Sequence, residues 1–341
     1  MKTIEHKNLY VDSSVGGRGD VWMRLIGFYA CAQLRPGIKI HLLVPDFIKE
    51  LAISVFRDRL IFVDQKPSQM KLTYTAIGIR SLLLGIVKGE RYIAPFVRVI
   101  IAEKKRKQFK DSINLFLFGL LDKLGLVHVP PDNIRATFHG YLETAGIKML
   151  RDISLESFSE QVNKDYSIIF ERLNGEIKIS TELKIPEDVN QNIVFFANGN
   201  SRQFAPLWWA KQNFPDAYYA FFHLEQDYLS FKDAGLKVIP FYKEVGDIVA
   251  IAKNAKWVVC TDSFSSHVLQ SAKQNCTVLI TEVVPSRVVS PAFKGPVVDN
   301  EVACHPCIHS HRSIACEAGL FECLNWKNDR YTENIKKSIP Q

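Results

Sequence analysis

Short apolar runs alternate with helix-like segments along both halves of this chain. In the first half, LYVDSS, KIHLLV and RLIFVD have the composition of strands, and the segments that begin at Val21 and at Pro45 have helical spacing. The alternation restarts at Asn192 with IVFFA, AYYAFF, LKVIPF, WVVC and TVLI. Strands that alternate with helices form parallel sheets covered by helices on both faces, so the sequence predicts an α/β fold.

The length of the chain favours two domains. A chain of 341 residues is too long for one simple core and suits two α/β domains. The middle region, residues 145–190, is polar and contains the turn signals LNGE and KIPEDVNQN. We therefore expect an N-terminal domain over residues 1–180 and a C-terminal domain over residues 181–341, whose last helix can pack back on the first domain.

Residues 257–291 form the most informative single stretch. Residues 257–260 and 277–280 are apolar runs typical of buried strands, and an amphipathic helix is predicted between them. Asp262 and Ser263 stand where a helix N-cap belongs, and there free N–H groups and the helix dipole favour a phosphate. An ordinary βαβ turn with a capped helix explains the same spacing.

A Gly-rich segment, SSVGGRGD, follows the first strand-like run and ends at Asp20. A strand, a Gly-rich turn and a helix form a geometry that binds phosphates or sugars in α/β folds. These glycines do not form a G-x-G-x-x-G fingerprint, and no P-loop Lys-Ser/Thr follows them. A simpler role for Asp20 is to cap the helix.

A third polar turn begins at Asn198 and Gly199, after the apolar run 193–197. Arg202 lies just beyond it, and a solvated surface arginine is the simplest interpretation of this position. Glu225 follows another apolar run, in FFHLEQD.

These turns resemble the motifs of glycosyltransferase family 9, the heptosyltransferase-like enzymes of lipopolysaccharide assembly. Asp262, Ser263 and His267 match the family's D-(S/T)-G-x-x-H signature. Phe264 stands where the family prefers Gly, and a Phe does not allow the close backbone approach that Gly allows. Arg202 replaces a Lys of the family pattern, and the resemblance implies that a cation here neutralises the leaving diphosphate, which a planar guanidinium can also do.

The resemblance implies a GT-B architecture, with two Rossmann-like domains whose parallel sheets face each other across a cleft. It also implies inverting transfer of a heptose-like sugar from a nucleotide-diphosphate donor, with neither a catalytic metal nor a cofactor. Asp20 would then be the general base that takes the acceptor proton. The donor-binding residues would be Gly19, Asn198, Gly199, Arg202, Glu225, Asp262, Ser263 and His267.

Two other interpretations remain open. One is a GT-B enzyme of another type, such as a nucleotide-sugar epimerase or a UDP-sugar transferase. The other is a non-catalytic protein that binds a nucleotide or a glycan. The sequence does not identify the sugar, the nucleotide base or the acceptor. For the acceptor, the resemblance implies a cell-surface glycan or a lipid-linked molecule.

The chain carries a formal net charge of +7, which is unevenly distributed. Between Lys88 and Lys110 there are eight Lys and Arg and only two Glu, and the apolar stretch INLFLFGLLDKLGL follows. We expect residues 88–121 to bind an anionic membrane surface. A solvated helix end and a nucleic-acid patch are the alternatives, but no nucleic-acid module accompanies the run, so we expect no nucleic-acid partner.

No apolar run of about 18 residues is present, and the N-terminus lacks the apolar region of a signal peptide. We therefore expect a cytoplasmic protein, with peripheral association at the inner face of the plasma membrane.

The cysteines fall into two groups. Three lie in apolar surroundings and are expected to be buried small hydrophobes: Cys31, Cys260 and Cys276. The other four cluster with three histidines and can hold zinc or remain free thiols: Cys304, Cys307, Cys316 and Cys323. A similar C-x-x-C cluster is common in family 9.

Overall fold

The computed structural model divides the chain into two compact units, Met1–Ile168 and Ile169–Gln341. The division lies inside helix α8 (Leu155–Asn174), whereas the sequence places it between residues 180 and 181. The end of this helix is tied to the second unit, because the Asn174 side-chain amide donates a 2.8 Å hydrogen bond to the carbonyl of Ala272. The structure describes residues 7–14, 17–68, 72–74, 79–89, 91–93, 109–124, 126–128, 154–175, 183–198, 205–272, 275–280, 285–299 and 326–340.

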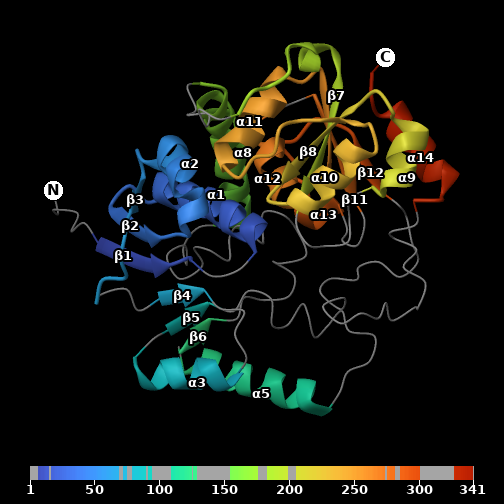
Figure 1. The fold of residues 1–341 in the computed structure, drawn as a ribbon. Coiled ribbons are helices and arrows are strands. Elements are labelled where there is room, and N and C mark those ends of the chain that lie inside the picture. Colours follow the sequence, from blue (N-terminus) through green and yellow to red (C-terminus); the bar gives the residue numbers. More distant parts are fainter. Residues whose placement is uncertain are drawn as a thin grey trace. The chain divides into compact units, whose positions relative to one another are not determined.

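The first unit contains a parallel sheet with the strand order β3-β2-β1-β4-β5-β6, which confirms the predicted α/β class (Figure 1). Its strands are β1 (Lys7–Asp12), β2 (Ile38–Leu43), β3 (Leu60–Phe62), β4 (Leu72–Tyr74), β5 (Arg91–Ile93) and β6 (Val127–His128). Its helices, besides the first part of α8, are α1 (Arg18–Leu34), α2 (Asp46–Phe56), α3 (Ile79–Val87) and α5 (Phe109–Lys123).

Helix α1 is the central helix of the first core. It begins at Arg18, earlier than the predicted start at Val21, so the Gly-Asp pair lies in its first turn. The rings of Trp22 and Tyr29 each lie 5.4 Å from the ring of Phe56 on α2, and all three side chains are fully buried. Burial of aromatic surface on this scale is a main source of stability for a domain.

The second unit repeats the strand order of the first. Read from its far edge, β9-β8-β7-β10-β11-β12 corresponds to β3-β2-β1-β4-β5-β6, and every pairing is parallel. Its strands are β7 (Ile193–Asn198), β8 (Tyr218–Phe222), β9 (Lys237–Val238), β10 (Trp257–Thr261), β11 (Cys276–Ile280) and β12 (Val297–Asp299). Its helices are η1 (Glu187–Gln191), α9 (Leu207–Asn213), α10 (Glu225–Asp233), α11 (Val245–Asn254), α12 (Phe264–Gln270), α13 (Pro285–Val288) and α14 (Asp329–Lys337).

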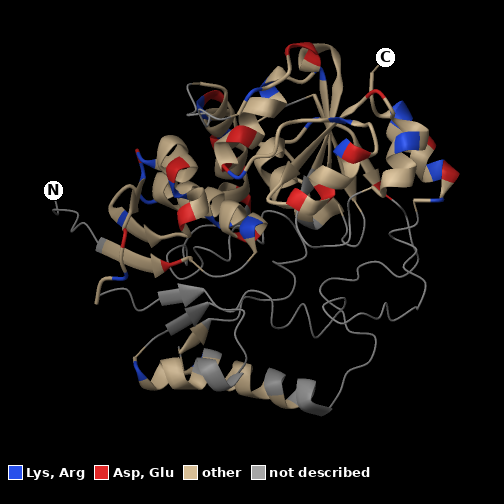
Figure 2. Cartoon of the chain, in the orientation of Figure 1, with Lys and Arg blue, Asp and Glu red and all other residues tan. Residues whose placement is uncertain are grey.

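The last helix, α14, belongs to the core of the second unit. The indole N–H of Trp209 donates a 2.9 Å hydrogen bond to the Thr332 hydroxyl, and the Trp209 ring lies 5.0 Å from that of Trp326. Tyr331 and Ile335 are buried in the same cluster, while the opposite face of α14 carries charges (Figure 2). This amphipathic arrangement covers one side of the sheet with apolar side chains.

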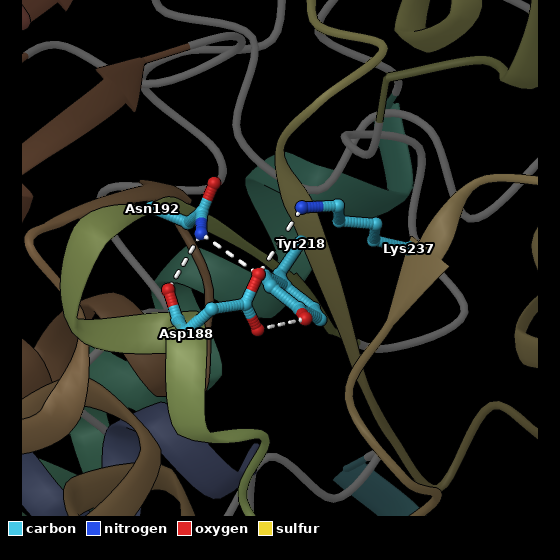
Figure 3. A network of polar contacts seen from close by, with 4 residues as sticks. All are labelled: Asp188, Asn192, Tyr218 and Lys237. Atoms are coloured by element: carbon cyan, nitrogen blue, oxygen red, sulfur yellow. Dashed lines mark hydrogen bonds and ion pairs between the residues drawn. The ribbon is translucent and has the colours of Figure 1, made fainter.

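A polar network joins η1 to the amino ends of β8 and β9 (Figure 3). The Asp188 carboxylate accepts hydrogen bonds from the Tyr218 hydroxyl at 2.5 Å and from the Lys237 ammonium at 3.2 Å. Asn192 donates to the backbone carbonyl and to the carboxylate of Asp188. The network therefore fastens a short 3-10 turn to the edge of the sheet where the strands begin.

Candidate functional site

Each sheet has one position at which the strand order reverses direction. In the first sheet this switch point lies between β1 and β4, and in the second it lies between β7 and β10. In doubly wound sheets, ligands bind outside the carboxyl ends of the strands at such a position. The three polar turns of the sequence follow β1, β7 and β10, so each borders a switch point.

The second switch point brings two predicted donor residues to the same level. Strands β7 and β10 pair in register, with Phe196 opposite Cys260. Asn198 and Asp262 each lie two residues beyond that pair, at the carboxyl ends of neighbouring strands. Asp262 is half-buried, and its backbone N–H donates to the carbonyl of Leu279 at 2.9 Å.

The turn after β10 is fixed by serine side chains. Ser263, not Asp262, is the N-cap of α12, which narrows the predicted cap to one residue. The Ser263 hydroxyl donates to the carbonyl of Thr261 at 3.0 Å, and its backbone N–H donates to the Ser266 hydroxyl at 3.1 Å. These bonds between serine side chains and the backbone hold the turn that presents Asp262 after β10.

Helix α12 is buried on all its faces, whereas the sequence predicts an amphipathic helix. All seven of its residues are buried, including His267, which is 8% exposed. His267 lies one turn into the helix, and its backbone N–H donates to the carbonyl of Ser263 at 3.3 Å. The helix fills the space beside the switch point rather than lying on the surface of the unit.

Phe264 is the first residue of α12 and points into the core. Its side chain is 7% exposed, and its ring lies 5.8 Å from that of Phe222 at the end of β8. The ring of Tyr242 lies 5.8 Å from Phe222 as well. The bulk that replaces the family's Gly is therefore absorbed by aromatic packing between β8 and α12.

Two hydroxyl groups next to this turn are buried without a hydrogen-bond partner among the described residues. They belong to Thr261 and Ser265, whose exposed fractions are 2% and 0%. An orphaned hydroxyl in a buried position costs roughly 1–3 kcal/mol, so such groups are expected where a ligand or a water molecule completes the site.

Glu225 and His223 lie at the neighbouring strand end. Asn198 on β7 is paired with Phe222, the last residue of β8, and Glu225 is the exposed first residue of α10. Between them, His223 has φ of 60°, and among the described residues it is the one non-glycine with positive φ. Such a conformation costs roughly 1–2 kcal/mol, and strain of this kind clusters at functional sites. No local sequence signal predicts it.

In the first unit, Asp20 is the third residue of α1 and is half-buried. Its carboxylate accepts a 3.1 Å hydrogen bond from the backbone N–H of Gly17, so it does help to cap the helix. Gly19 lies beside it in the same turn. Capping and base catalysis are compatible, because a carboxylate has two oxygens and lone pairs to spare.

Arg24 fixes the segment around Asp20. This side chain is 4% exposed and donates to the carbonyls of Asp20 at 3.2 Å and Ser13 at 3.4 Å. It therefore ties the first turn of α1 to the loop after β1. The signal in the sequence is an arginine within the otherwise apolar run VWMRLIGF.

Asp12 is a further buried carboxylate, at a position where the sequence indicates only the end of a strand. It is 7% exposed at the carboxyl end of β1 and accepts hydrogen bonds from the backbone N–H of Ser14 at 3.1 Å and the Ser14 hydroxyl at 2.5 Å. Its other oxygen lies 3.3 Å from the Lys66 ammonium. An Asp followed by two serines is the local signal for such a turn.

Several predicted groups lie outside the described residues. These are Gly199, Arg202, the basic run from Lys104 to Lys107, and the cluster of Cys304, Cys307, Cys316 and Cys323. Within the described part of the chain, no group of three or more His, Cys, Asp or Glu is arranged to hold a metal ion. The described helices include none that is both long and apolar enough to span a bilayer. Cys31, Cys260 and Cys276 are buried, as predicted, and none of the three forms a disulfide within the described residues.

A pocket of about 380 Å³ lies at the opposite, amino edge of the second sheet. Its walls include Asn192, Phe214, Trp257 and Pro340. Since the strands begin here, this pocket is separate from the switch point and from the predicted donor residues.

Solved structures share this fold, although no protein-family model matches the chain and no curated protein matches it significantly. A glycosyltransferase family 9 protein from Veillonella parvula DSM 2008 has a TM-score of 0.58 and 11% identity, over 99% of this chain and 98% of that chain. The ADP-heptose lipopolysaccharide heptosyltransferase II of E. coli has a TM-score of 0.51 and 14% identity, over 97% and 99% of the two chains. The E. coli heptosyltransferase WaaC with ADP has a TM-score of 0.44 and 12% identity, over 82% and 89%. The predicted resemblance to family 9 and the GT-B type of fold are thus confirmed as a likeness of fold.

Proposed function

We propose that this chain, which has the fold of the family 9 glycosyltransferases, is an inverting glycosyltransferase. It would move a heptose-like sugar from a nucleotide-diphosphate donor to a cell-surface glycan or a lipid-linked acceptor. The observation that carries the proposal is the position of the polar turns: each borders a switch point of a doubly wound sheet, in a fold that matches a family 9 enzyme over almost its whole length.

The proposed donor site lies at the switch point of the second unit. Asn198 ends β7, Asp262 directly follows the neighbouring strand β10, and the orphaned hydroxyls of Thr261 and Ser265 belong to the same turn as Asp262. A sugar nucleotide is rich in hydroxyl and phosphate oxygens, which such polar groups can bind. Arg202, four residues after Asn198 in the sequence, would neutralise the diphosphate as it leaves.

The name of one solved structure with this fold includes its donor, ADP-heptose. We extend that donor class, a nucleotide diphosphate linked to a sugar, to this chain as part of the proposal. Glu225 is exposed at the neighbouring strand end, where it would bind the nucleoside hydroxyls. Gly19 and His267 would complete the set, Gly19 by leaving room beside Asp20 and His267 from within α12.

Asp20 would act as the general base. As the acceptor hydroxyl oxygen attacks the anomeric carbon, its proton passes to the Asp20 carboxylate, and the bond from that carbon to the diphosphate breaks with its electron pair on the phosphate oxygen. A single displacement of this kind inverts the anomeric carbon. Arg24 would position the base, because it holds the carbonyl of Asp20 and the preceding loop together.

Incubation with a panel of ADP-, GDP- and UDP-sugars tests the donor assignment without knowledge of the acceptor. We expect one nucleotide to stabilise the protein and its sugar conjugate to be hydrolysed slowly. Release of an epimerised sugar nucleotide would overturn the transferase in favour of an epimerase. Binding without turnover, also in the presence of lipopolysaccharide-derived acceptors, would indicate a non-catalytic binding protein.

Substitution of Asp20 by Asn tests the base. The Asn side-chain oxygen can still accept the Gly17 N–H, so the fold and the donor affinity should be retained, while turnover should fall by roughly 10²–10⁴-fold because the amide cannot take a proton. Asp46→Asn is the matched control, since Asp46 is also a first-turn acid of a helix in this unit. Near-normal turnover of the Asp20→Asn variant would remove Asp20 from the mechanism.

A further inference from the structure

The exposed apolar side chains of this protein are concentrated on two helices of the first unit. Of the eleven large hydrophobic residues that are exposed in the described part of the chain, seven lie on α3, on α5 or directly after α5. We name this set the α3–α5 face: Leu83, Leu84, Val87, Ile113, Phe116, Leu120 and Leu124.

The topology places both helices on the same face of the sheet. Helix α3 connects β4 to β5, and α5 connects β5 to β6, so both crossovers advance in the same direction through neighbouring parallel strands. Such crossovers are right-handed, and two of them in the same direction lay their helices on one side. Helix α3 contacts β5 and α5 contacts β6, so the two helices cover adjacent strands of the sheet.

Helix α5 is apolar on two faces. Phe118 and Leu121 are buried, as the inner face of a surface helix requires. Ile113, Phe116 and Leu120 recur at helical spacing on another side and are exposed, with Phe116 at 71%. An ordinary surface helix is polar there. On α3, Val87 is 86% exposed, and the described residues of both helices are mostly uncharged (Figure 2).

The sequence segment that contains this face is strongly basic. Residues 79–124 contain ten Lys and Arg and four Asp and Glu, a formal charge of +6 within a chain of +7. Lys88 directly follows Val87, and Lys123 directly precedes Leu124, and both lysines are exposed. The run from Lys104 to Lys107 precedes the first residue of α5 by only a few positions in the sequence.

The exposed apolar side chains of the α3–α5 face and the basic residues of the same segment together determine which kind of partner fits. In a dimer formed through this face, two segments that each carry a formal charge of +6 would repel each other. A nucleic acid would gain nothing from the exposed Leu, Val and Phe side chains. An anionic bilayer accepts both parts, since apolar side chains enter the acyl boundary and basic side chains meet the headgroups. We propose that the α3–α5 face docks on an anionic lipid bilayer.

Sedimentation of the full chain with vesicles tests this proposal. We expect binding to vesicles that contain phosphatidylglycerol at low salt, weaker binding at high salt, and little binding to pure phosphatidylcholine. The double variant Val87→Gln, Phe116→Gln should lose affinity roughly tenfold or more per side chain, because each loses the burial of its apolar surface. Both residues are exposed, so the fold should persist, as circular dichroism can verify.

The matched control is Ile61→Gln with Leu229→Gln, which removes two exposed apolar side chains elsewhere. It should bind vesicles like the unmodified protein. No binding of the unmodified protein, an equal loss in both double variants, or equal binding to anionic and neutral vesicles would overturn the proposal. A dimer that dissociates in the Val87→Gln, Phe116→Gln variant, without vesicle binding, would assign the face to self-association instead. Donor hydrolysis is measured without vesicles, so failure here is distinguishable from failure of the transferase proposal.

Discussion

The side chain of Phe264 lies in the core of the second unit, against Phe222, and not at the surface of the carboxyl edge. The ring is therefore part of the aromatic packing between β8 and α12. A Gly at this position would remove the side chain that fills the space between β8 and α12. The departure from the family pattern is thus compensated by packing.

Substitution of Phe264 by Gly should lower the free energy of unfolding by roughly 3–5 kcal/mol, as for other large-to-small changes in a core, with up to about 1 kcal/mol more for the flexibility of Gly. Nucleotide affinity should not improve. Urea denaturation and calorimetry measure both, and Phe264→Leu, which keeps most of the volume, should cost less. A stable Gly variant with tighter nucleotide binding would show that the ring obstructs the donor site.

At the scale of elements, η1 is attached to β8 and β9 by a few polar side chains. The hydrogen bond from Tyr218 holds the pKa of Asp188 below its ordinary value, and the Lys237 ammonium adds to this effect. Burial raises the pKa of Tyr218 to about 12, and the hydrogen bond to Asp188 acts in the same direction. Both shifts favour the ionised carboxylate paired with the neutral phenol.

The pH dependence of stability should report this attachment. An unfolded tyrosine ionises near pH 10, at about its model-peptide pKa, while folded Tyr218 stays protonated to about pH 12. Its contribution is therefore fully present below about pH 10 and is lost as the pH rises to about 12. The difference in unfolding free energy between the unmodified protein and Tyr218→Phe should shrink across that window.

Tyr228→Phe is the control for this measurement, since it removes a phenol from α10, outside the network. Chemical denaturation at several alkaline pH values gives the free energies. A constant difference between the unmodified protein and Tyr218→Phe from about pH 9 to 12 would contradict the raised pKa of Tyr218.

At the scale of the whole molecule, the chain contains the same doubly wound strand order twice, with one switch point in each unit. The predicted donor residues, apart from Gly19, belong to the second unit, and the predicted base belongs to the first. Nucleotide binding and proton abstraction are therefore assigned to different units and should respond separately to mutation.

Hydrogen exchange of the full chain with nucleoside diphosphate should show this division. Protection should be largest in peptides that cover residues 193–206 and 257–272, and the free energy of unfolding should rise by about 2.7 kcal/mol at 100 times the dissociation constant. Asp262→Ala should weaken both effects without the loss of a helix cap, because Ser263 is the N-cap. Asp329→Ala in α14 is the control, and protection confined to the first unit would contradict the assignment.

The sequence by itself determined the α/β class, the positions of most strands, and the polar turns that follow β1, β7 and β10. These features depend on local periodicity and on turn residues, which act over a few neighbouring positions. It overestimated β9, which spans only Lys237–Val238 before Pro240, a residue that has no N–H for a ladder.

Only the tertiary structure decided which side chains are buried. Two contacts join residues that are far apart in the chain: the ion pair of Asp12 with Lys66 and the packing of Phe264 on Phe222. The complete burial of α12 likewise depends on distant parts of the chain. The exposed side of α5 is the converse case, since its apolar residues have the spacing of a core helix and only the neighbouring strands show which of them are covered. Burial is a property of three-dimensional neighbours, and local sequence does not contain it.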